Sequence, residues 1–322
     1  MAEFKIEEID ETTYGKFLEE NPPDDPFSLL PFLLACREAF HVEPIFLSIF
    51  KNGTPIGVSS FSVGKRFGVP LIQLIPGRTY DGVQFRKLGE STNQKQEYEK
   101  LLSLQALEEF LERNFAFHQI VFPPIMTDIR AFQWAGAKVE PQYTYKVNLS
   151  TFSEERYTKS LIKELRSAKE SGLTAQKCGI DELAALQKSS YGRHGRTPPI
   201  PTETLKVLLE KLDTSGLLKT TGAKDRSGRL LSAIAALRAG KDSYLFVGGM
   251  EAGGAGGASH LLYHEILKSE KENGMASVDF CGANTPSINL FKSAFGPELQ
   301  VYFRIMKANS AITRLALLLK KS

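Results

Sequence analysis

The chain has 322 residues, of which 42% are hydrophobic and 24% are charged. This composition is typical of a soluble globular protein and excludes disordered and fibrous classes. The net charge of +3 argues against a dedicated DNA-binding protein, in which a strongly basic face is expected. Because the length exceeds that of a usual single core, we expect two domains of about 150 residues each.

Cysteine usage and the apolar runs indicate the compartment. Cys36, Cys178 and Cys281 lie far apart, without CxxC or Cys/His spacing, so we expect neither a disulfide framework nor a metal site. The N-terminus is acidic and has no apolar core of a signal peptide. No stretch approaches the roughly 20 apolar residues of a transmembrane helix. A cytoplasmic location is therefore expected.

The first half alternates helical and strand patterns. Asn52-Gly53 separates two β-rich runs and is a strong hairpin signal. Apolar residues at helical spacing predict a long helix before a short buried strand. The expected strands are 4–9, 44–51, 54–63, 69–75, 119–122 and 138–149, and the expected helices are 12–21, 31–40, 95–114 and 128–134.

The second half repeats this pattern. A capping-box sequence at 151–154 predicts a helix that ends at Gly172 and carries its basic residues on one face. Two more helices, a three-stranded meander, a glycine-rich loop and a further helix follow. The expected helices start at Asp181, Thr202 and Ser259, and the expected strands are 217–223, 230–239, 243–248, a buried strand ending at Asp279, and 299–306.

The two halves therefore share one order of elements, which indicates an internal duplication. The segment from Phe122 to Gly136 also resembles the segment from Phe280 to Gly296 in outline. We predict mixed α/β domains at residues 1–150 and 151–310, followed by a helical tail at 311–322.

The closing segments carry a family resemblance. Asp279-Phe280-Cys281-Gly282, followed by Phe291-Lys292 and Phe295-Gly296, resembles the FemABX family. The segment KELRSAKESG at 163–172 is similar to the family's basic helix, and residues 124–145 resemble the end of its first domain. The resemblance covers most of the chain in order, and its specificity lies in the succession of motifs.

The resemblance implies two tandem GNAT-type (acyl-CoA N-acyltransferase) domains and transfer of an acyl group to an amine. The donor would be acyl-CoA or an aminoacyl-tRNA, with acyl-CoA as a candidate co-substrate. Two differences between this sequence and the family motifs bear on the identity of the donor. Residues 172–180 are too short for the helical arm of some peptidoglycan-bridge enzymes, and residues 248–257 are not a clear copy of the GNAT Q/R-x-x-G-x-G/A loop.

Three candidate catalytic residues follow from this resemblance. Lys292 corresponds to the lysine of the family's Phe-Lys pair and would stabilise charge near the reacting centre, although a solvated helix lysine is the alternative. Asp279 ends a buried strand, where functional carboxylates are common, or else caps the following turn. Tyr302 would protonate a leaving group, as tyrosines do in some GNAT-type enzymes, or pack in the sheet.

Glycines predict the donor-binding segment. Glycine lets backbone N–H groups approach an anion, and a helix N-terminus adds a favourable dipole. A flexible surface connection is the alternative. The candidate donor-binding residues are Gly254, Gly256, Gly257 and Ser259.

Basic and aromatic residues predict the acceptor side. Lys163 and Arg166 lie on the basic helix face, which would meet a nucleotide, a tRNA or an anionic envelope precursor, or would simply be solvated. Arg193, His194 and Arg196 cluster in a Gly/Pro-rich loop. Tyr80 is expected to line the acceptor groove.

The resemblance implies a cytoplasmic bacterial N-acyltransferase that acts on an amine, with a cell-envelope or peptidoglycan precursor as the candidate acceptor. Its expected partners are a small acyl donor and an amine, with tRNA as a further candidate. The alternative is a catalytically silent double-GNAT protein that binds a nucleotide-linked precursor.

Overall fold

A computed structural model describes residues 2–66, 68–86, 92–193, 195–251 and 256–309. The chain forms two compact units. The first unit contains residues 1–23, 27–142 and 301–322, and the second contains residues 24–26 and 143–300. The predicted tail at 311–322 lies outside the described residues.

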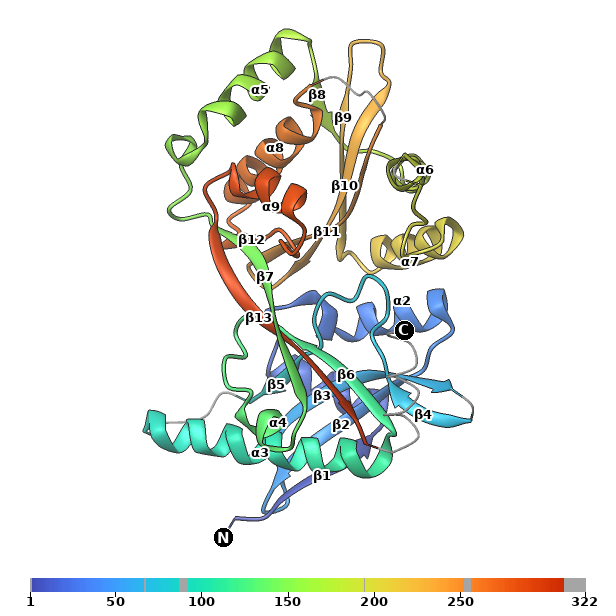
Figure 1. The fold of residues 1–322 in the computed structure, drawn as a ribbon, viewed down its shortest axis with the longest axis vertical. Coiled ribbons are helices and arrows are strands. Elements are labelled where there is room, and N and C mark those ends of the chain that lie inside the picture. Colours follow the sequence, from blue (N-terminus) through green and yellow to red (C-terminus); the bar gives the residue numbers. More distant parts are fainter. Residues whose placement is uncertain (1, 67, 87–91, 194, 252–255, 310–322) are drawn as a thin grey trace. The chain divides into compact units, whose positions relative to one another are not determined.

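The first unit is built on one twisted sheet (Figure 1). Its strands are hydrogen-bonded in the order β1-β2-β3-β4-β6-β13, and β5 pairs with β3. Its strands are β1 (Phe4–Ile9), β2 (Pro44–Lys51), β3 (Thr54–Arg66), β4 (Val69–Ile72), β5 (Val83–Phe85), β6 (Phe117–Phe122) and most of β13 (Glu298–Ala308), and its helices are α1 (Glu11–Glu20), η1 (Pro26–Ser28), α2 (Leu30–Phe40), α3 (Asn93–Asn114) and α4 (Arg130–Trp134).

Helices cover both faces of this sheet. Leu47 of β2 packs in a core with α3 and α4, whereas its neighbour Phe46 contacts Tyr14 of α1. Successive side chains of a strand point to opposite faces, so α1 lies on the face opposite α3. Leu101, Leu104, Leu107 and Leu111 of α3 fall at helical spacing and are buried, as the sequence predicts.

The second unit has the same plan. Its strands are hydrogen-bonded in the order β7-β12-β11-β10-β9-β8, and β11 and β12 are parallel. Its elements are the end of β7 (Lys138–Asn148), η2 (Glu154–Arg156), α5 (Lys159–Glu170), β8 (Thr174–Gln176), α6 (Ile180–Gly192), α7 (Thr202–Thr214), β9 (Leu218–Lys224), β10 (Leu230–Ala239), β11 (Asp242–Met250), α8 (Ala258–Glu272), β12 (Ser277–Asp279) and α9 (Pro286–Ser293).

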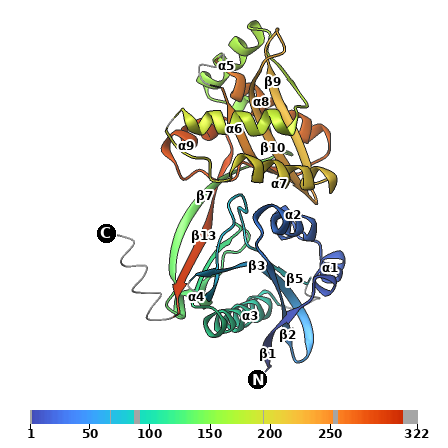
Figure 2. The same ribbon diagram turned by 90° about the vertical axis from the view of Figure 1, so that its right-hand side faces the viewer.

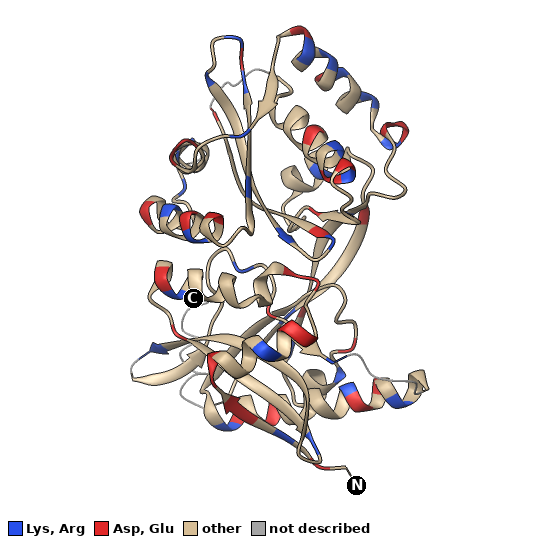
Figure 3. Ribbon diagram, turned by 180° about the vertical axis from the view of Figure 1, so that it is seen from behind, with Lys and Arg blue, Asp and Glu red and all other residues tan. Residues whose placement is uncertain are grey.

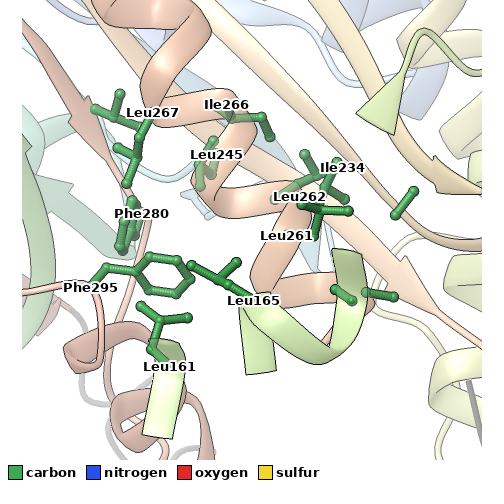
Figure 4. Close-up of a cluster of buried hydrophobic side chains, with 14 of the residues drawn as sticks. Leu161, Leu165, Ile234, Leu245, Leu261, Leu262, Ile266, Leu267, Phe280 and Phe295 are labelled. Atoms are coloured by element: carbon green, nitrogen blue, oxygen red, sulfur yellow. The ribbon is translucent and has the colours of Figure 1, made fainter. Parts of the chain in front are cut away.

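The second sheet is also covered on both faces. Helices α5 and α8 lie on one face, and α6 and α7 lie on the other (Figure 2). The core under α8 is apolar, with side chains from the helices and strands interleaved (Figure 4). Its labelled members are Leu161, Leu165, Ile234, Leu245, Leu261, Leu262, Ile266, Leu267, Phe280 and Phe295.

Two strands continue from one unit into the other. Residues 146–148 of β7 pair with β12 in the second unit, and residues 303–308 of β13 pair with β6 in the first. The sequence places 138–149 with the first domain and 299–306 with the second. The difference arises because hydrophobic alternation predicts a strand but not the sheet that it joins.

The start of α5 also differs from the sequence expectation. Ser153 accepts a hydrogen bond from Glu155 N, but only the short turn η2 follows. Tyr157 is extended, and the Thr158 side chain caps a helix that begins at Lys159. The short strands β5 and β8 were not predicted, because three residues carry too little periodicity. Within the described ranges, no helix is both long enough and apolar enough to span a bilayer.

Candidate active site

The candidate site lies where two parallel strands of the second unit diverge. β11 and β12 pair only from Asp242/Ser277 to Tyr244/Asp279. β12 ends at Asp279, while β11 continues to Met250 beside β10. Ligands bind at such carboxyl ends of parallel strands, since the backbone there is no longer used by a neighbouring strand.

The pleat of β11 directs Gly248 toward this divergence. Glu251 N donates to Leu231 O of the β10 side at 2.8 Å. Backbone groups alternate between the two sides of a strand, so those of Gly249 point toward β10 and those of Gly248 point toward the side from which β12 departs. Gly248 was not predicted as a site residue, because register alone decides the direction of its amide.

Gly249 lets a helix approach the end of the strand. A Cβ on Gly249 would lie 2.4 Å from Gln187 N and 2.5 Å from the Leu186 carbonyl carbon of α6. A side chain at this position would therefore displace α6 from the sheet. Gly249 therefore allows close packing of α6, in addition to any contact that the glycines of β11 make with a ligand.

The predicted donor segment meets the first turn of α8. Gly257 is the N-cap with φ 86°, and a Cβ there would lie 2.4 Å from the Glu164 carbonyl oxygen. Ser259 Oγ lies 3.0 Å from Ser232 Oγ of β10. Gly256 is exposed, and Gly254 lies outside the described residues. The described donor candidates thus sit together at a helix N-terminus, close to the end of β11.

Arg193 also belongs to this end of β11. Its guanidinium donates to the carbonyls of Met250 and Glu251, at 3.3 Å each. The structure therefore places Arg193 beside the glycine segment that was predicted for the donor. Arg196 is exposed, and His194 lies outside the described residues.

Asp279 organises the turn that follows β12. Its Oδ1 accepts the Thr144 hydroxyl at 2.6 Å and Cys281 N at 2.7 Å. The bond to Cys281 N is the turn-capping contact that the sequence analysis gave as one alternative. Cys281 has φ 53° and Gly282 has φ 94°, so the chain reverses within two residues. Asp279 is 2% exposed.

Lys292 of α9 holds the same turn from the other side. Its Nζ donates to the carbonyls of Phe280, Cys281 and Gly282 at 2.5, 3.4 and 2.7 Å. An ammonium has three protons, so these carbonyls match its donor capacity. Burial lowers the pKa of Lys292, while the nearby Cys281 and Asp279 oppose this shift. Lys292 is thus a buried residue and not the solvated lysine of the alternative interpretation.

Two predicted residues lie in the first unit. Tyr80 is 1% exposed, and its ring packs edge to face on Phe27 and on Tyr302. Tyr302 is 7% exposed. These contacts place both rings in an aromatic core, which is the packing alternative for Tyr302.

Lys163 and Arg166 are exposed on α5, while Leu161, Leu165 and Ala168 are buried. Basic residues follow this helix in Figure 3. The predicted amphipathic division of the helix is thereby confirmed.

An aromatic cluster joins α8 to α9. Tyr263 packs against Phe280, Phe291 and Phe295 with ring centroids 5.0–5.5 Å apart. The ring of His260, one turn nearer the glycine segment, lies 4.8 Å from that of Phe291. Burial lowers the pKa of His260, and Glu164 opposes this shift. A neutral imidazole is therefore favoured beside the donor segment.

A separate groove of about 360 Å³ lies at the other end of α8. Lys219, one of its charged lining residues, pairs with the buried Glu270 carboxylate at 3.0 Å. Among the described residues, no group of histidine, cysteine and carboxylate side chains could hold a metal ion.

Comparison with known proteins agrees with this geometry. Residues 155–292 match the model of the acetyltransferase (GNAT) domain. No curated protein sequence matches the chain significantly.

Solved structures resemble the whole chain. FemX is 14% identical, with a TM-score of 0.66 over 93% of this chain and 96% of FemX. L-PGS from Bacillus licheniformis is 12% identical, with a TM-score of 0.59 over 98% and 97% of the two chains. A tandem GNAT protein from the clavulanic acid biosynthesis pathway is 12% identical, with a TM-score of 0.54 over 96% and 99%.

These matches confirm the predicted mixed α/β fold with tandem GNAT-type units. The GNAT domain model covers the elements that surround the diverging strands. Residues 155–292 thus carry a GNAT-type domain, and the whole chain shares its fold with FemX and with a tandem GNAT protein.

Proposed function

We propose that the second unit binds an activated acyl donor where β11 and β12 diverge and transfers its acyl group to an amine. The observation that carries this proposal is that β11 and β12 stop pairing at Tyr244 and Asp279, while β11 continues to Met250 near the first turn of α8. The donor's phosphates would lie near Gly256, Gly257 and Ser259, with Gly254 in the same segment. The N-terminus of a helix favours anions.

The acyl carbonyl would lie along β11, near the Gly248 amide. A backbone N–H aimed at the developing oxyanion lowers the barrier to attack by the amine. Lys292 and Asp279 fix the turn opposite, so we assign them to positioning the site. Because Tyr302 packs in the aromatic core of the first unit, our mechanism gives it no proton-transfer role.

We propose acyl-CoA as the first donor to test and aminoacyl-tRNA as the second. The resemblance of the closing segments to the FemABX family makes an amine on an envelope precursor our proposed acceptor class. Lys163, Arg166 and Arg196 are exposed and remain candidates for its anionic groups. His194 stays a candidate from the sequence and lies outside the described residues. We propose a cytoplasmic reaction, since Cys36, Cys178 and Cys281 form no disulfide with one another.

Ligand binding tests the donor site. Acetyl-CoA, longer acyl-CoAs and aminoacyl-tRNA should be screened by thermal shift, because a ligand that binds only the folded protein raises the melting temperature. Ser259→Ala should reduce the shift, whereas Ser269→Ala in the last turns of the same helix should leave it unchanged. If no acyl-CoA raises the melting temperature, acyl-CoA is excluded as the donor.

Transfer must then be measured by mass spectrometry with a panel of amines. Product formation supports the enzyme. A donor that binds to the wild-type protein without turnover across the panel would favour the silent binding protein instead.

A further inference from the structure

Three consecutive residues of β7 hold the turn between β12 and α9. Tyr143 N donates to Asn284 Oδ1 at 2.8 Å, and Tyr143 O accepts Ala283 N at 2.7 Å. Tyr145 O accepts Phe280 N at 2.8 Å. The Tyr145 hydroxyl also donates to Asn289 Oδ1 of α9 at 2.8 Å. One short strand segment therefore contacts both ends of the turn and the helix that carries Lys292.

Thr144 stands at the centre of these contacts. Its hydroxyl donates to Asp279 Oδ1 at 2.6 Å and accepts Gly282 N at 3.0 Å. The side chain is fully buried, at 0% exposure. A hydroxyl has one proton to donate and lone pairs to accept, so Thr144 uses both capacities on the two ends of the turn.

Thr144 and Lys292 hold complementary parts of this turn. The N–H groups of residues 280–283 go to β7 and to Asp279, while the carbonyls of residues 280–282 go to Lys292. Between them, Cys281 keeps φ 53°, a conformation that residues other than glycine adopt only when their surroundings enforce it. The turn is therefore fixed from two sides.

We propose that Thr144 is a positioning residue for acyl transfer, acting through Asp279 and the Cys281 turn. This inference rests on the proposed function of the second unit. The donor's phosphates would be anchored at the start of α8, away from the turn, so loss of the Thr144 hydroxyl should affect the reacting end of the donor more than its binding. A small misplacement of reacting groups costs about 100-fold in rate.

Thr144→Val removes the hydroxyl at nearly constant volume, and Thr144→Ser keeps it. We expect Thr144→Val to lower kcat about 100-fold with little change in the donor KM, and Thr144→Ser to restore most of the activity. Thr220→Val is the matched control. Thr220 of β9 is also buried, but its hydroxyl donates to Cys178 O at 2.7 Å and not to the turn. The control should keep its kcat.

Alkylation of Cys281 by iodoacetamide reports the turn without any substrate. Peptide mass spectrometry separates Cys281, which is partly exposed, from the buried Cys36 and Cys178. Loosening of the turn in Thr144→Val should raise the Cys281 alkylation rate about tenfold. Thr144→Ser and Thr220→Val should match the wild-type rate.

The two measurements separate the inference from the proposed function. An unchanged Cys281 alkylation rate in Thr144→Val overturns the positioning role, even if kcat falls. An accelerated alkylation with an unchanged kcat also overturns it. If the wild-type protein transfers no acyl group at all, the proposed function fails, and the positioning role in acyl transfer fails with it, while alkylation still decides whether Thr144 fixes the turn.

Discussion

The two units differ at one corresponding helix position. Gly136 and Gly296 both have positive φ, at 82° and 66°, and each amide bonds to the carbonyl three residues before it. Four residues before each glycine stand Phe132 and Lys292. Phe132 is fully buried against Phe122, whereas Lys292 binds three carbonyls. The corresponding helices α4 and α9 therefore have different roles: α4 closes an apolar core in the first unit, and α9 fixes a polar turn in the second.

The strand divergence differs as well. In the first unit, β4 and β6 pair in parallel at Leu71/Phe117 and Ile72/His118. Beyond this point, Asp81 occupies the edge of β6: its amide donates to Val121 O at 2.6 Å, and its Oδ2 accepts Val121 N at 3.0 Å.

A buried arginine completes this filling. Arg78 lies 3.2 Å from Asp81 Oδ1 and donates to Ser60 Oγ at 2.9 Å. The first unit therefore fills the place where, in the second unit, we propose the donor. Two units with the same fold need not both carry a binding site, because the side chains at the strand ends determine whether the space between the strands is open to a ligand.

The largest loss of stability is expected when the ion pair between Asp81 and Arg78 is broken. Asp81→Asn leaves the Arg78 charge buried without its carboxylate partner, which should destabilise the first unit by about 3–5 kcal/mol. Hydrogen exchange of first-unit peptides measures this loss. Asp128→Asn, at an exposed pair with Arg130, should cost under about 1 kcal/mol. Equal effects of the two variants would contradict the assigned role of the filled divergence.

The next effect concerns Lys292. Lys292→Met leaves the carbonyls of residues 280–282 without their shared donor, so we expect about 3 kcal/mol of destabilisation in the second unit and loss of transfer activity. Urea unfolding and the transfer assay measure these two effects. Lys188→Met, at an exposed position on α6, is the control. Wild-type activity in Lys292→Met would refute its part in the site.

A smaller loss of stability is expected as the pH falls. His264 is 1% exposed, and its Nδ1 lies 3.2 Å from the Tyr157 hydroxyl. Burial lowers the pKa of His264 below its usual 6.5. The unfolded chain then binds the proton first, so stability is fully present above pH 6.5 and decreases on acidification until the lowered folded pKa is reached.

His264→Gln should reduce this pH dependence. Urea unfolding between about pH 5 and 8 measures it. Residual dependence is expected from His260, whose pKa shifts in the same direction. An identical slope in the variant and the wild type would show that His264 does not titrate as we describe.

The smallest effect on stability is expected on the basic face of α5. Replacing Lys163 and Arg166 by alanine should change stability by less than about 0.5 kcal/mol, because both side chains are exposed. If this face binds tRNA phosphates, the slope of log affinity against log salt should fall by about 2. Filter binding at several salt concentrations measures it, and an unchanged slope would remove the tRNA contact.

Sequence patterns predict the local elements well, because periodicity reports burial on one side of a helix or strand. Leu161, Leu165 and Ala168 are buried as their spacing on α5 predicts, and the Asn52-Gly53 signal does mark the β2–β3 hairpin. The glycine segment before α8 was likewise predicted, although Gly254 lies outside the described residues.

Long-range contacts were less accessible to the sequence. Asp279 and Lys292 were predicted to be functional, but the sequence does not show that both hold one turn. Thr144 lies 135 residues from Asp279, so no local pattern connects them. Arg193 lies by the donor segment because of where α6 ends beside β11.

By itself, the sequence determined the repeated order of elements, the amphipathic faces and the segments rich in site residues, because these depend on local propensity and burial. The tertiary structure alone decided the exchange of β7 and β13, the filled divergence in the first unit and the carbonyls that surround Lys292. Each depends on strand register and on contacts between residues distant in sequence, which side-chain patterns do not encode.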